Sequence, residues 1–475
     1  MNDSGISIKP KAYVLSDSDV EKIHGATLDM LAQTGVQLQH PKAAEILAGA
    51  GARVEKDRIY LPANVINAAI DNSPSRVILG CRNREDTIIL EGDRTWYGPC
   101  LDCLNYLDPI SDERRAYTSD DCRINASLSD GLPHFTWVMT LGLADDALPE
   151  IADRVIARQA LTYCEKPLTF CCQSLDSTRD IYEMSLAICG NERQFENAPQ
   201  IASILSPTSP LSLSEVTVDR LLFCVEKGIP VIICPAPSAG STSPATLAGT
   251  IVQANAESLS CLTLAQILQP GFPVIYGAMP SIMDMATTIF SYGATELSLM
   301  SGAFCQMVKH YQLPSFGTGG CSDAKYVDVQ AAVEATFSLL SSSLNGANLI
   351  HDCGILDHGS VASPAYNVLI NEVLGMIKSY ERGILLNDET LALDVVDRVG
   401  PGGHFLEEAH TLNNFRNVWY PQLFERMDYD RWLEKGARHF EERLVEKTKQ
   451  AMAHVPAPLS PEVIRELDRL ATHWK

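Results

Sequence analysis

The segment NLIHDCG at residues 348–354 decides the fold, because it is the eighth short apolar run that ends in small or polar residues. The seven earlier runs are RTWYGP (94–99), FTWVMTLG (135–142), PLTFCCQ (167–173), QIASILSP (200–207), PVIICPAP (230–237), PVIYGAMP (273–280) and PSFGTGG (314–320). Long amphipathic segments such as EIADRVIARQALTYCEK (150–166) separate them, and the runs recur every 30 to 43 residues. Eight successive strand–helix units predict an α/β protein with a closed (β/α)8 TIM barrel.

Two smaller parts flank this barrel. Helical patterns and the alternating, hairpin-like stretch RVEKDRIYLP (53–62) predict a small α+β cap over residues 1–93, packed on a barrel of residues 94–383. Residues 384–475 are more charged and predict a helical extension, in which DYDRWLEKGARHFEERLVEKTKQAMAH (428–454) reads as one long helix. Its charged side is either a solvated face or a subunit or partner contact through Trp432, Phe440 and Leu444.

Composition excludes several classes of partner. The formal net charge of -22 disfavours phosphate backbones and anionic lipid surfaces, so we expect neither nucleic acid nor membrane as a partner. The first residues carry no apolar signal region, and no apolar run is long enough to span a bilayer, so we expect a cytoplasmic protein. The 14 cysteines are then expected to be reduced core residues, with strand-end packing favoured over metal or redox use for the CxxC pair Cys100 and Cys103.

Chemistry on such a barrel is expected where its strands end. The pattern places the following residues there: Trp96, Tyr97, Asp102, Gln173, Ser206, Cys234, Tyr276, Thr318, Cys321, Asp323, His351 and Asp352. Strand alternation directs His351 and Cys353 to one face and Asp352 to the other. We expect His351 to face the lumen; the alternative is a histidine that only hydrogen-bonds the rim.

Aromatic residues give the mouth a second character. Trp96, Tyr97, Tyr276, Phe316 and Tyr326 lie at or near the predicted strand ends, and a ring face attracts a quaternary ammonium by about 0.5 to 2 kcal/mol. The alternative is that these rings only pack loops over the barrel. The glycine-rich stretch GTGG (317–320) offers the backbone amides of Thr318, Gly319 and Gly320 to an anion.

Metal binding is the competing interpretation. The sequence holds no HExxH or His-x-His pattern, so we expect no metal. A zinc site remains possible if His351 converges with Cys234, Cys321 or Cys353 in three dimensions.

The stretch 35–74, GVQLQHPKAAEILAGAGARVEKDRIYLPANVINAAIDNSP, resembles the trimethylamine:corrinoid methyltransferase family, as do TGGCSDAKYVDVQAAVEATFSLL (318–340) and the tail from residue 384. The similarity is greatest to the branch without pyrrolysine, whose members include glycine betaine:corrinoid methyltransferases. It implies a (β/α)8 barrel that binds no cofactor itself and passes an N-methyl group to the Co(I) of cobalamin on a separate corrinoid protein. This chain contains only standard residues, which disfavours trimethylamine and favours a quaternary amine, above all glycine betaine.

The resemblance implies a simple reaction. When the methyl group leaves a quaternary amine, the nitrogen becomes a neutral tertiary amine that needs no general acid, so we expect positioning and desolvation and no catalytic residue. The expected substrate-binding residues are Trp96, Tyr97, Gln173, Tyr276, Phe316, Tyr326, His351 and Asp352. Either His351, Gln173 or the GTGG amides would then donate to a betaine carboxylate.

Around that site we expect Asp352 to support His351 or to anchor a loop. Asp357 and His358 are expected to meet the corrinoid protein, and the chain is expected to form a homo-oligomer. Two alternatives remain: a zinc-dependent methyltransferase or lyase on the same barrel, and a quaternary-amine binding protein without turnover.

Overall fold

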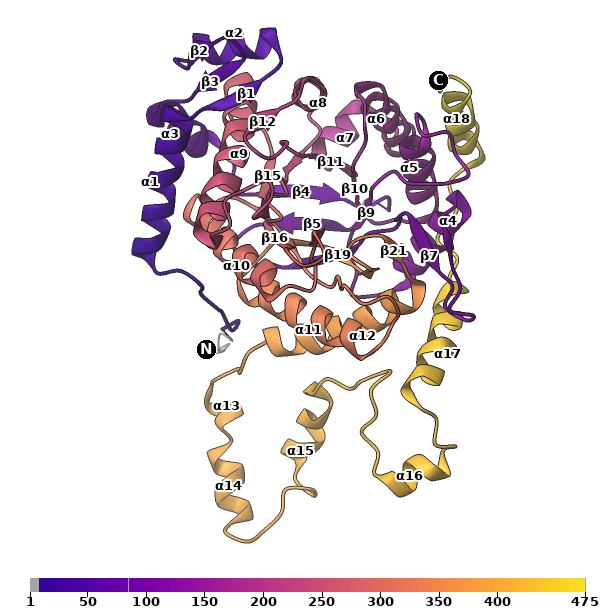
Figure 1. Cartoon of the computed structure of the whole chain (residues 1–475). Helices are drawn as coiled ribbons and strands as arrows, with labels where there is room; N and C mark the ends of the chain where they lie inside the picture. The colour runs from indigo at the N-terminus through magenta and orange to yellow at the C-terminus, as the bar shows by residue number, and fades with distance from the viewer. Residues whose placement is uncertain (1–7, 84, 475) are drawn as a thin grey trace.

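The computed structural model describes residues 8–83 and 85–474. Residues 1–7 of the predicted cap and residue 475 of the predicted extension lie outside the described residues, as does part of the N-terminus in which no signal was expected. The predicted (β/α)8 barrel is confirmed (Figure 1). The boundaries proposed between cap, barrel and extension stay a prediction.

All eight apolar runs form strands of one parallel sheet. They are β6 (Trp96–Pro99), β9 (Val138–Thr140), β10 (Leu168–Phe170), β11 (Ile201–Leu205), β13 (Val231–Ile233), β15 (Val274–Gly277), β18 (Ser315–Thr318) and β19 (Leu349–Cys353). Each strand pairs with the next in the chain, and β19 returns to β6. Strands buried on both faces can be apolar throughout, which is why these runs show no polar alternation.

Contacts between β6 and β9 close the barrel. The amide of Thr136 donates to the carbonyl of Tyr97 at 2.9 Å, and the amide of Leu101 donates to that of Met139 at 2.8 Å. Parallel bridges join Tyr97 to Phe135 and Cys100 to Met139. The sheet therefore has no free edge at this seam.

One long helix follows each strand and covers the outside of the barrel (Figure 1). The helices are α4 (Ser119–Gly131), α5 (Ala152–Tyr163), α6 (Leu175–Cys189), α8 (Glu215–Lys227), α9 (Leu247–Leu268), α10 (Thr295–His310), α11 (Val329–Leu344) and α12 (Pro364–Glu381); the short α7 (Glu192–Asn197) follows α6. None of the described helices combines the length and the apolar character that crossing a membrane requires.

The N-terminal residues form a cap on the side of the barrel. Its elements are α1 (Asp17–Gln33), β1 (Val36–Leu38), α2 (Pro41–Gly49), β2 (Arg53–Glu55), β3 (Arg58–Tyr60) and α3 (Ala63–Asn72). Strand β1 pairs with β3 and with β12 (Ser212–Leu213) of the barrel, and α1 is tied to α9 because the Asn255 amide donates to Thr27 Oγ1 at 3.1 Å. The hairpin expected at 53–62 is present as β2 and β3.

A second hairpin covers the N-terminal end of the barrel. It consists of β4 (Val77–Gly80) and β5 (Thr87–Leu90). The indole N–H of Trp96 donates to the carbonyl of Ile89 at 2.9 Å, and the Asn348 amide donates to the carbonyls of Gly92 and Arg94 just after the hairpin. The N-terminal ends of β6 and β19 are therefore tied to this hairpin.

Two small sheets stand at the opposite end, where the barrel strands end. One contains β7 (Asn105–Leu107), β8 (Arg114–Ala116), β20 (Ile355–Leu356) and β21 (Val361–Ala362). The other contains β14 (Ser238–Ala239), β16 (Ser281–Asp284) and β17 (Ile289–Phe290). Because they follow β6, β19, β13 and β15 directly, these insertions surround the mouth.

The C-terminal part contains α13 (Asp388–Leu391), α14 (Leu393–Val399), α15 (Ala409–Asn414), η1 (Phe415–Asn417), α16 (Tyr429–Glu434), α17 (Phe440–Met452) and α18 (Pro461–Ala471). The single helix predicted over 428–454 is wrong: Gly436 and Ala437 take φ of 93° and 49°, which ends α16 before α17 begins. Leu444 is buried within its own chain, so it is not free for the alternative subunit or partner contact.

Candidate active site

The site is built on the last residues of β19. The pairing of β19 with β6 shifts register between Ile350 and Cys353, and within that bulge Asp352 takes a φ of 64°. This left-handed conformation is uncommon for a residue other than glycine, although aspartate tolerates it better than most. It breaks the predicted alternation and brings the carboxylate of Asp352 to within 2.9 Å of His351 Nδ1.

His351 is held from three sides. Its Nε2 lies 3.0 Å from Thr318 Oγ1, and its ring stacks on Phe316 with the ring centres 4.1 Å apart and an angle of 3° between the planes. Its Nδ1 faces Asp352 at a distance that suits an ion pair but without the angle of a hydrogen bond. The ring therefore orders the site, and its nitrogens face protein groups rather than an open space for a substrate carboxylate.

Asp352 is a buried carboxylate with one oxygen that accepts no hydrogen bond. The residue is 3% exposed, and its Oδ2 has no hydrogen-bond partner among residues 8–83 and 85–474. Within that part of the chain, the ion pair recorded for it is the one with His351. Burying a charge without compensation is expensive, so such a group points to a ligand that supplies positive charge.

Four weakly acidic side chains lie within electrostatic range of this carboxylate. Burial first, and then the charge of Asp352, raises the pKa of the thiols of Cys234, Cys321 and Cys353. The same two causes raise the pKa of the Tyr292 phenol. The charge of Asp352 thus acts on all four groups and favours their neutral forms.

Two further carboxylates lie near the strand ends. Asp102 is fully buried and accepts the amides of Leu141 and Leu143 at 2.8 and 2.7 Å, while burial raises its pKa to about 6. Asp323 accepts the amide of Tyr292 at 2.8 Å and lies 2.9 Å from His358 Nδ1. Asp102 therefore orders the loop after β9, and Asp323 positions Tyr292.

The rim beside Asp323 is an ionic network. Lys325 Nζ lies 3.0 Å from His358 Nε2 and 3.1 Å from Asp357 Oδ1, and Arg114 reaches the other oxygen of Asp357 at 2.6 Å. The loop with Asp357 and His358 is thus partly exposed and bonded to neighbouring loops. That a corrinoid protein meets it stays a prediction.

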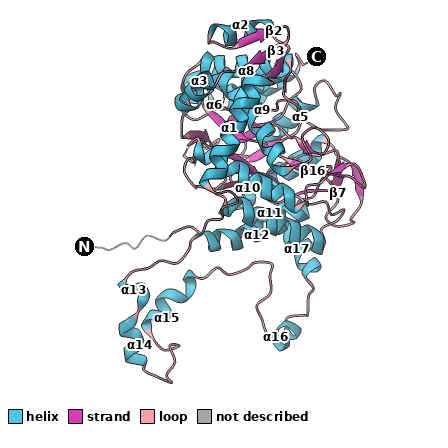
Figure 2. Cartoon of the chain, turned by 60° about the vertical axis from the view of Figure 1, so that its left-hand side comes forward, coloured by secondary structure: helices cyan, strands magenta, loops and turns pink. Residues whose placement is uncertain are grey.

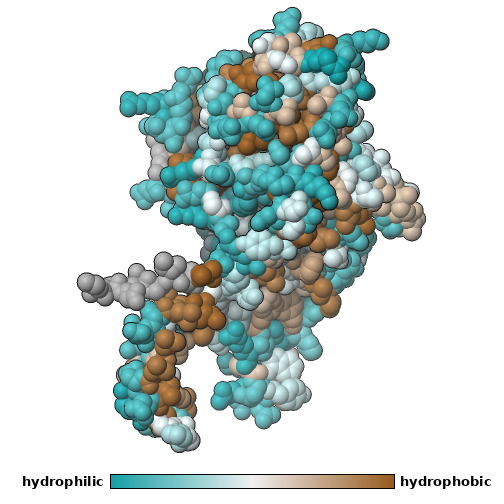
Figure 3. Space-filling model, turned by 90° about the vertical axis from the view of Figure 1, so that its left-hand side faces the viewer, coloured by the Kyte–Doolittle hydropathy of each residue, from teal (hydrophilic) through white to brown (hydrophobic). Residues whose placement is uncertain are grey.

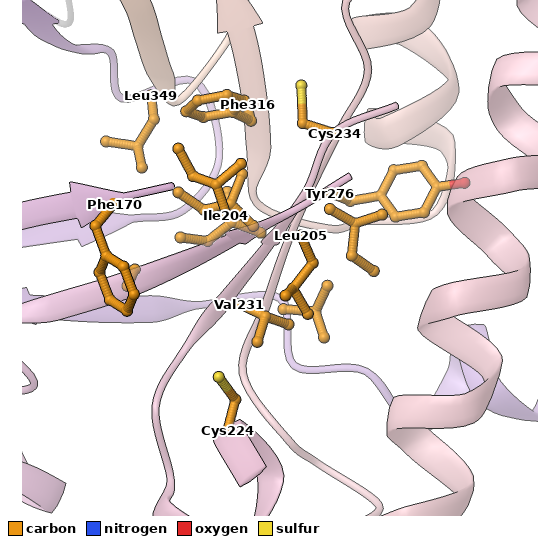
Figure 4. Packing of buried hydrophobic residues seen from close by; sticks show 14 of the residues in the cluster. Phe170, Ile204, Leu205, Cys224, Val231, Cys234, Tyr276, Phe316 and Leu349 are labelled. Carbon is orange, nitrogen blue, oxygen red and sulfur yellow. The ribbon is translucent and has the colours of Figure 1, made fainter. Parts of the chain in front are cut away.

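The structure does not bring the aromatic residues predicted at the strand ends together at the mouth. Trp96 is paired with Leu349, the first residue of β19, and so lies at the N-terminal end of the barrel. Tyr97 faces outward, where its hydroxyl donates to Glu381 Oε1 at 3.2 Å. Tyr276 also points away from the lumen toward a helix, because its hydroxyl bonds Asn255 of α9 (Figure 4). Tyr326 is 52% exposed on the loop before α11.

Of the five predicted rings, Phe316 lies with the site. It contacts His351 and, at 6.1 Å between ring centres, Trp137. Figure 4 shows it beside Leu349 inside the barrel. It forms the floor under the His351 ring rather than one wall of an aromatic cage.

The predicted backbone donors Gly319 and Gly320 already donate to protein acceptors. The amide of Gly319 donates to the carbonyl of His351 at 3.1 Å, and that of Gly320 donates to Ser338 Oγ at 3.0 Å. Thr318 contributes its side chain to His351 instead of an amide to a ligand. Gln173 follows β10 and Ser206 follows β11, and both side chains are exposed.

The cysteines are free thiols, buried except for the partly exposed Cys171, and Cys100 and Cys103 lie within the hydrophobic core. Across the described ranges, no three His, Cys, Asp or Glu side chains are placed so that they could hold a metal ion. The zinc alternative through His351 and the cysteines therefore has no ligand set among them.

Tyr292 is a site residue that the sequence did not indicate. It lies outside the eight runs, in the insertion that carries β16 and β17, so the strand-end rule does not reach it. An aromatic residue in an unusually long βα segment was the available signal.

Comparison with known proteins gives consistent relatives. A family model described as trimethylamine methyltransferase matches residues 5–472. Glycine betaine methyltransferase of Desulfitobacterium hafniense strain Y51 is 31% identical over 466 residues, covering 96% of each chain. Trimethylamine methyltransferase MttB of Desulfitobacterium hafniense strain DSM 10664 / DCB-2 is 31% identical over 455 residues, covering 95% of this chain and 92% of that protein.

A solved structure has the same fold. The monomethylamine methyltransferase of Methanosarcina barkeri superposes with a TM-score of 0.52 over 94% of this chain and 89% of that one, at 11% sequence identity. At this identity the likeness concerns the barrel alone.

Proposed function

The chain belongs to the trimethylamine methyltransferase family, and from that premise we propose that it transfers an N-methyl group from a quaternary amine to the Co(I) of a separate corrinoid protein. Glycine betaine, which would leave as dimethylglycine, is the leading substrate. The relative named glycine betaine methyltransferase supports this choice over 96% of the chain. The observation that carries the proposal is the carboxylate of Asp352 at the barrel mouth, which is 3% exposed and whose Oδ2 has no hydrogen-bond partner among the described residues.

Asp352 supplies what a quaternary ammonium needs. The cation has no N–H to donate, so it is recognised by charge and by contact with polarisable groups rather than by directed hydrogen bonds. The thiols of Cys234 and Cys321 and the ring of Tyr292 are uncharged, polarisable groups within electrostatic range of the carboxylate. A cation placed here lowers the cost of burying a carboxylate that is 3% exposed and whose recorded ion pair is with His351.

The proposed chemical step needs no acid or base from the protein. The bond between nitrogen and the methyl carbon breaks, its electron pair stays on nitrogen as a neutral tertiary amine, and the methyl group passes to cobalt, which supplies the attacking electron pair. No proton moves, so no residue has to act as acid or base. Asp352 holds the ammonium, His351 stacked on Phe316 keeps Asp352 in position, and the burial of the carboxylate excludes water.

A betaine must also place its own carboxylate. Asp352 repels that group, so the substrate carboxylate has to point away from the end of β19. His351 and the Gly319 and Gly320 amides face protein partners. Gln173, at the end of β10, is the remaining donor of the predicted set.

Methyl transfer tests the proposal directly. The purified chain is mixed with a corrinoid protein reduced to Co(I), and the visible spectrum reports methyl-Co(III). The panel contains glycine betaine, proline betaine, carnitine, choline and trimethylamine. We expect a spectral change with at least one quaternary amine and none with trimethylamine. Methylation by trimethylamine alone, or tight amine binding without any transfer, contradicts the proposal.

A further inference from the structure

Residues 384–418, called the arm below, extend away from the globular body. They contain α13, α14, α15 and η1, and Figure 2 shows these elements standing clear of the barrel and its helices. Both ends of the arm return to the body: α12 precedes it, and Gln422 and Leu423 after it donate to the carboxylate of Glu372 on α12 at 2.7 and 2.9 Å. The arm therefore leaves the body at the end of α12 and returns to the same helix.

The arm is rich in apolar side chains that its own chain leaves uncovered. Eleven large ones are exposed, and brown surface runs along the arm in Figure 3: Ile384, Leu385, Leu386, Leu391, Leu393, Val396, Phe405, Leu406, Leu412, Phe415 and Val418. Leu406 is 84% exposed. The hydrogen bonds and ion pairs recorded for residues 385–418, such as Arg398 to Glu408, join arm residues to one another. An exposed apolar patch of this size marks an interaction surface.

The position of the arm argues against a transient partner that must reach the mouth. The arm follows the C-terminal end of α12, where Glu381 bonds Tyr97 near the start of β6 and pairs with Lys9. This is the end of the barrel opposite His351 and Asp352. A permanent partner suits such an apolar surface better, since obligate interfaces are the more hydrophobic ones.

The body carries a second uncovered apolar surface, on the outer face of α11. Val329, Val333 and Phe337 are spaced four residues apart and therefore share one face, and they are 80%, 62% and 52% exposed. A chain that bears both an apolar arm and an apolar stripe has the two halves of a self-complementary contact.

We propose that the arm packs against the α11 stripe of a second copy of this chain, with each copy giving its arm to the other. Eleven side chains at their observed exposures offer roughly 700 Å² of apolar surface per chain, close to the about 800 Å² that each partner contributes to a standard interface. The predicted homo-oligomer thus gains a specific interface, which does not depend on the reaction.

Two double variants of the full chain test this pairing. One carries Leu406→Asp and Leu412→Asp in the arm, and the other carries Val333→Asp and Phe337→Asp in the stripe. All four side chains are exposed, so folding is expected to persist, as circular dichroism will check. Val216→Asp, an exposed apolar residue of α8, is the matched control. Light scattering after gel filtration measures the mass against 51.9 kDa for one chain.

We expect the wild type and the control to run as assemblies of two or more copies, and each double variant to dissociate with a dissociation constant raised about 100-fold or more. Mixing the two double variants is expected to restore assembly in part, because a mixed pair keeps one intact arm and one intact stripe. Hydrogen exchange of the arm is expected to rise in the stripe variant.

Three results would overturn the proposal. The first is a wild type that is a monomer, including one whose arm is protected by its own body. The second is an assembly that survives the arm substitutions. The third is the absence of any restoration on mixing, which would mean that the arm and the α11 stripe do not contact each other.

Discussion

Replacing Asp352 by asparagine removes the buried charge while keeping the shape and the backbone. Asparagine, like aspartate, tolerates the left-handed region that the φ of 64° requires. An ammonium about 4 Å from a carboxylate gains about 4 kcal/mol at an effective dielectric constant of 20. We take about half of this, because the amide oxygen of asparagine keeps a partial negative charge. A loss of about 2 kcal/mol corresponds to roughly 30-fold weaker binding of the quaternary amine.

Turnover should respond differently from binding. The positive charge leaves nitrogen as the methyl group departs, so Asp352 stabilises the bound amine more than the transition state. We therefore expect kcat of Asp352→Asn to be unchanged or raised, and kcat/KM to fall by less than the dissociation constant rises. Titration calorimetry with the amine gives the dissociation constant, and the rate of methyl-Co(III) formation gives kcat and KM.

Asp112→Asn is a matched control. Asp112 also has a positive φ, of 55°, but it lies exposed in the turn between β7 and β8. The same substitution there should leave binding and turnover unchanged. If Asp352→Asn binds every quaternary amine as tightly as the wild type does, the carboxylate does not face the ammonium and the proposed site is wrong.

Four other outcomes are expected. Tyr97→Phe removes the hydrogen bond to Glu381 and should lower the unfolding free energy by about 1 kcal/mol with kcat unchanged. A large loss of kcat would indicate that Tyr97 acts in the active site at the mouth. Tyr292→Phe should raise KM less than tenfold at an unchanged melting temperature, since only the hydroxyl near Asp352 is lost. Glu372→Ala should cost about 2 kcal/mol and expose residues 419–428 to protease, because the amides of Gln422 and Leu423 lose their acceptor. Burial raises the pKa of Asp102 in the folded state to about 6, above that of the unfolded chain, so its contribution to stability is full below about pH 4 and is lost as pH rises through 6. Relative to Asp102→Asn, the unfolding free energy of the wild type should therefore fall by about 3 kcal/mol between these pH values. An unfolding free-energy difference that does not change with pH would contradict the raised pKa.

The sequence was sufficient for the barrel but not for the orientation of its side chains. Eight apolar runs with helices between them leave few alternatives to a closed parallel barrel. The same continuous apolar character removes the alternation that would show which face of a strand is inside, and so Tyr276 was assigned to the lumen although it points to α9. The run RTWYGP predicts a strand that ends near Trp96 and Tyr97, whereas β6 begins at Trp96 and ends at Pro99.

The local backbone conformation at the site could not be predicted from the sequence either. Nothing in NLIHDCG signals the bulge that turns Asp352 toward His351, since the conformation depends on the pairing of β19 with β6. His351 was expected at the mouth and lies there, but its partners, Thr318 and Phe316, come from the neighbouring strand and become visible only with the register.

The β4–β5 hairpin has a consequence for the order of events. Because it covers the N-terminal end of the barrel, amine and cobalt have to approach Asp352 from the same side. Once a corrinoid protein sits on the mouth, it blocks the route of the amine. Kinetics under the proposed reaction should therefore be ordered, with the amine binding first and the demethylated amine leaving last, and an excess of corrinoid protein should inhibit by trapping the empty enzyme.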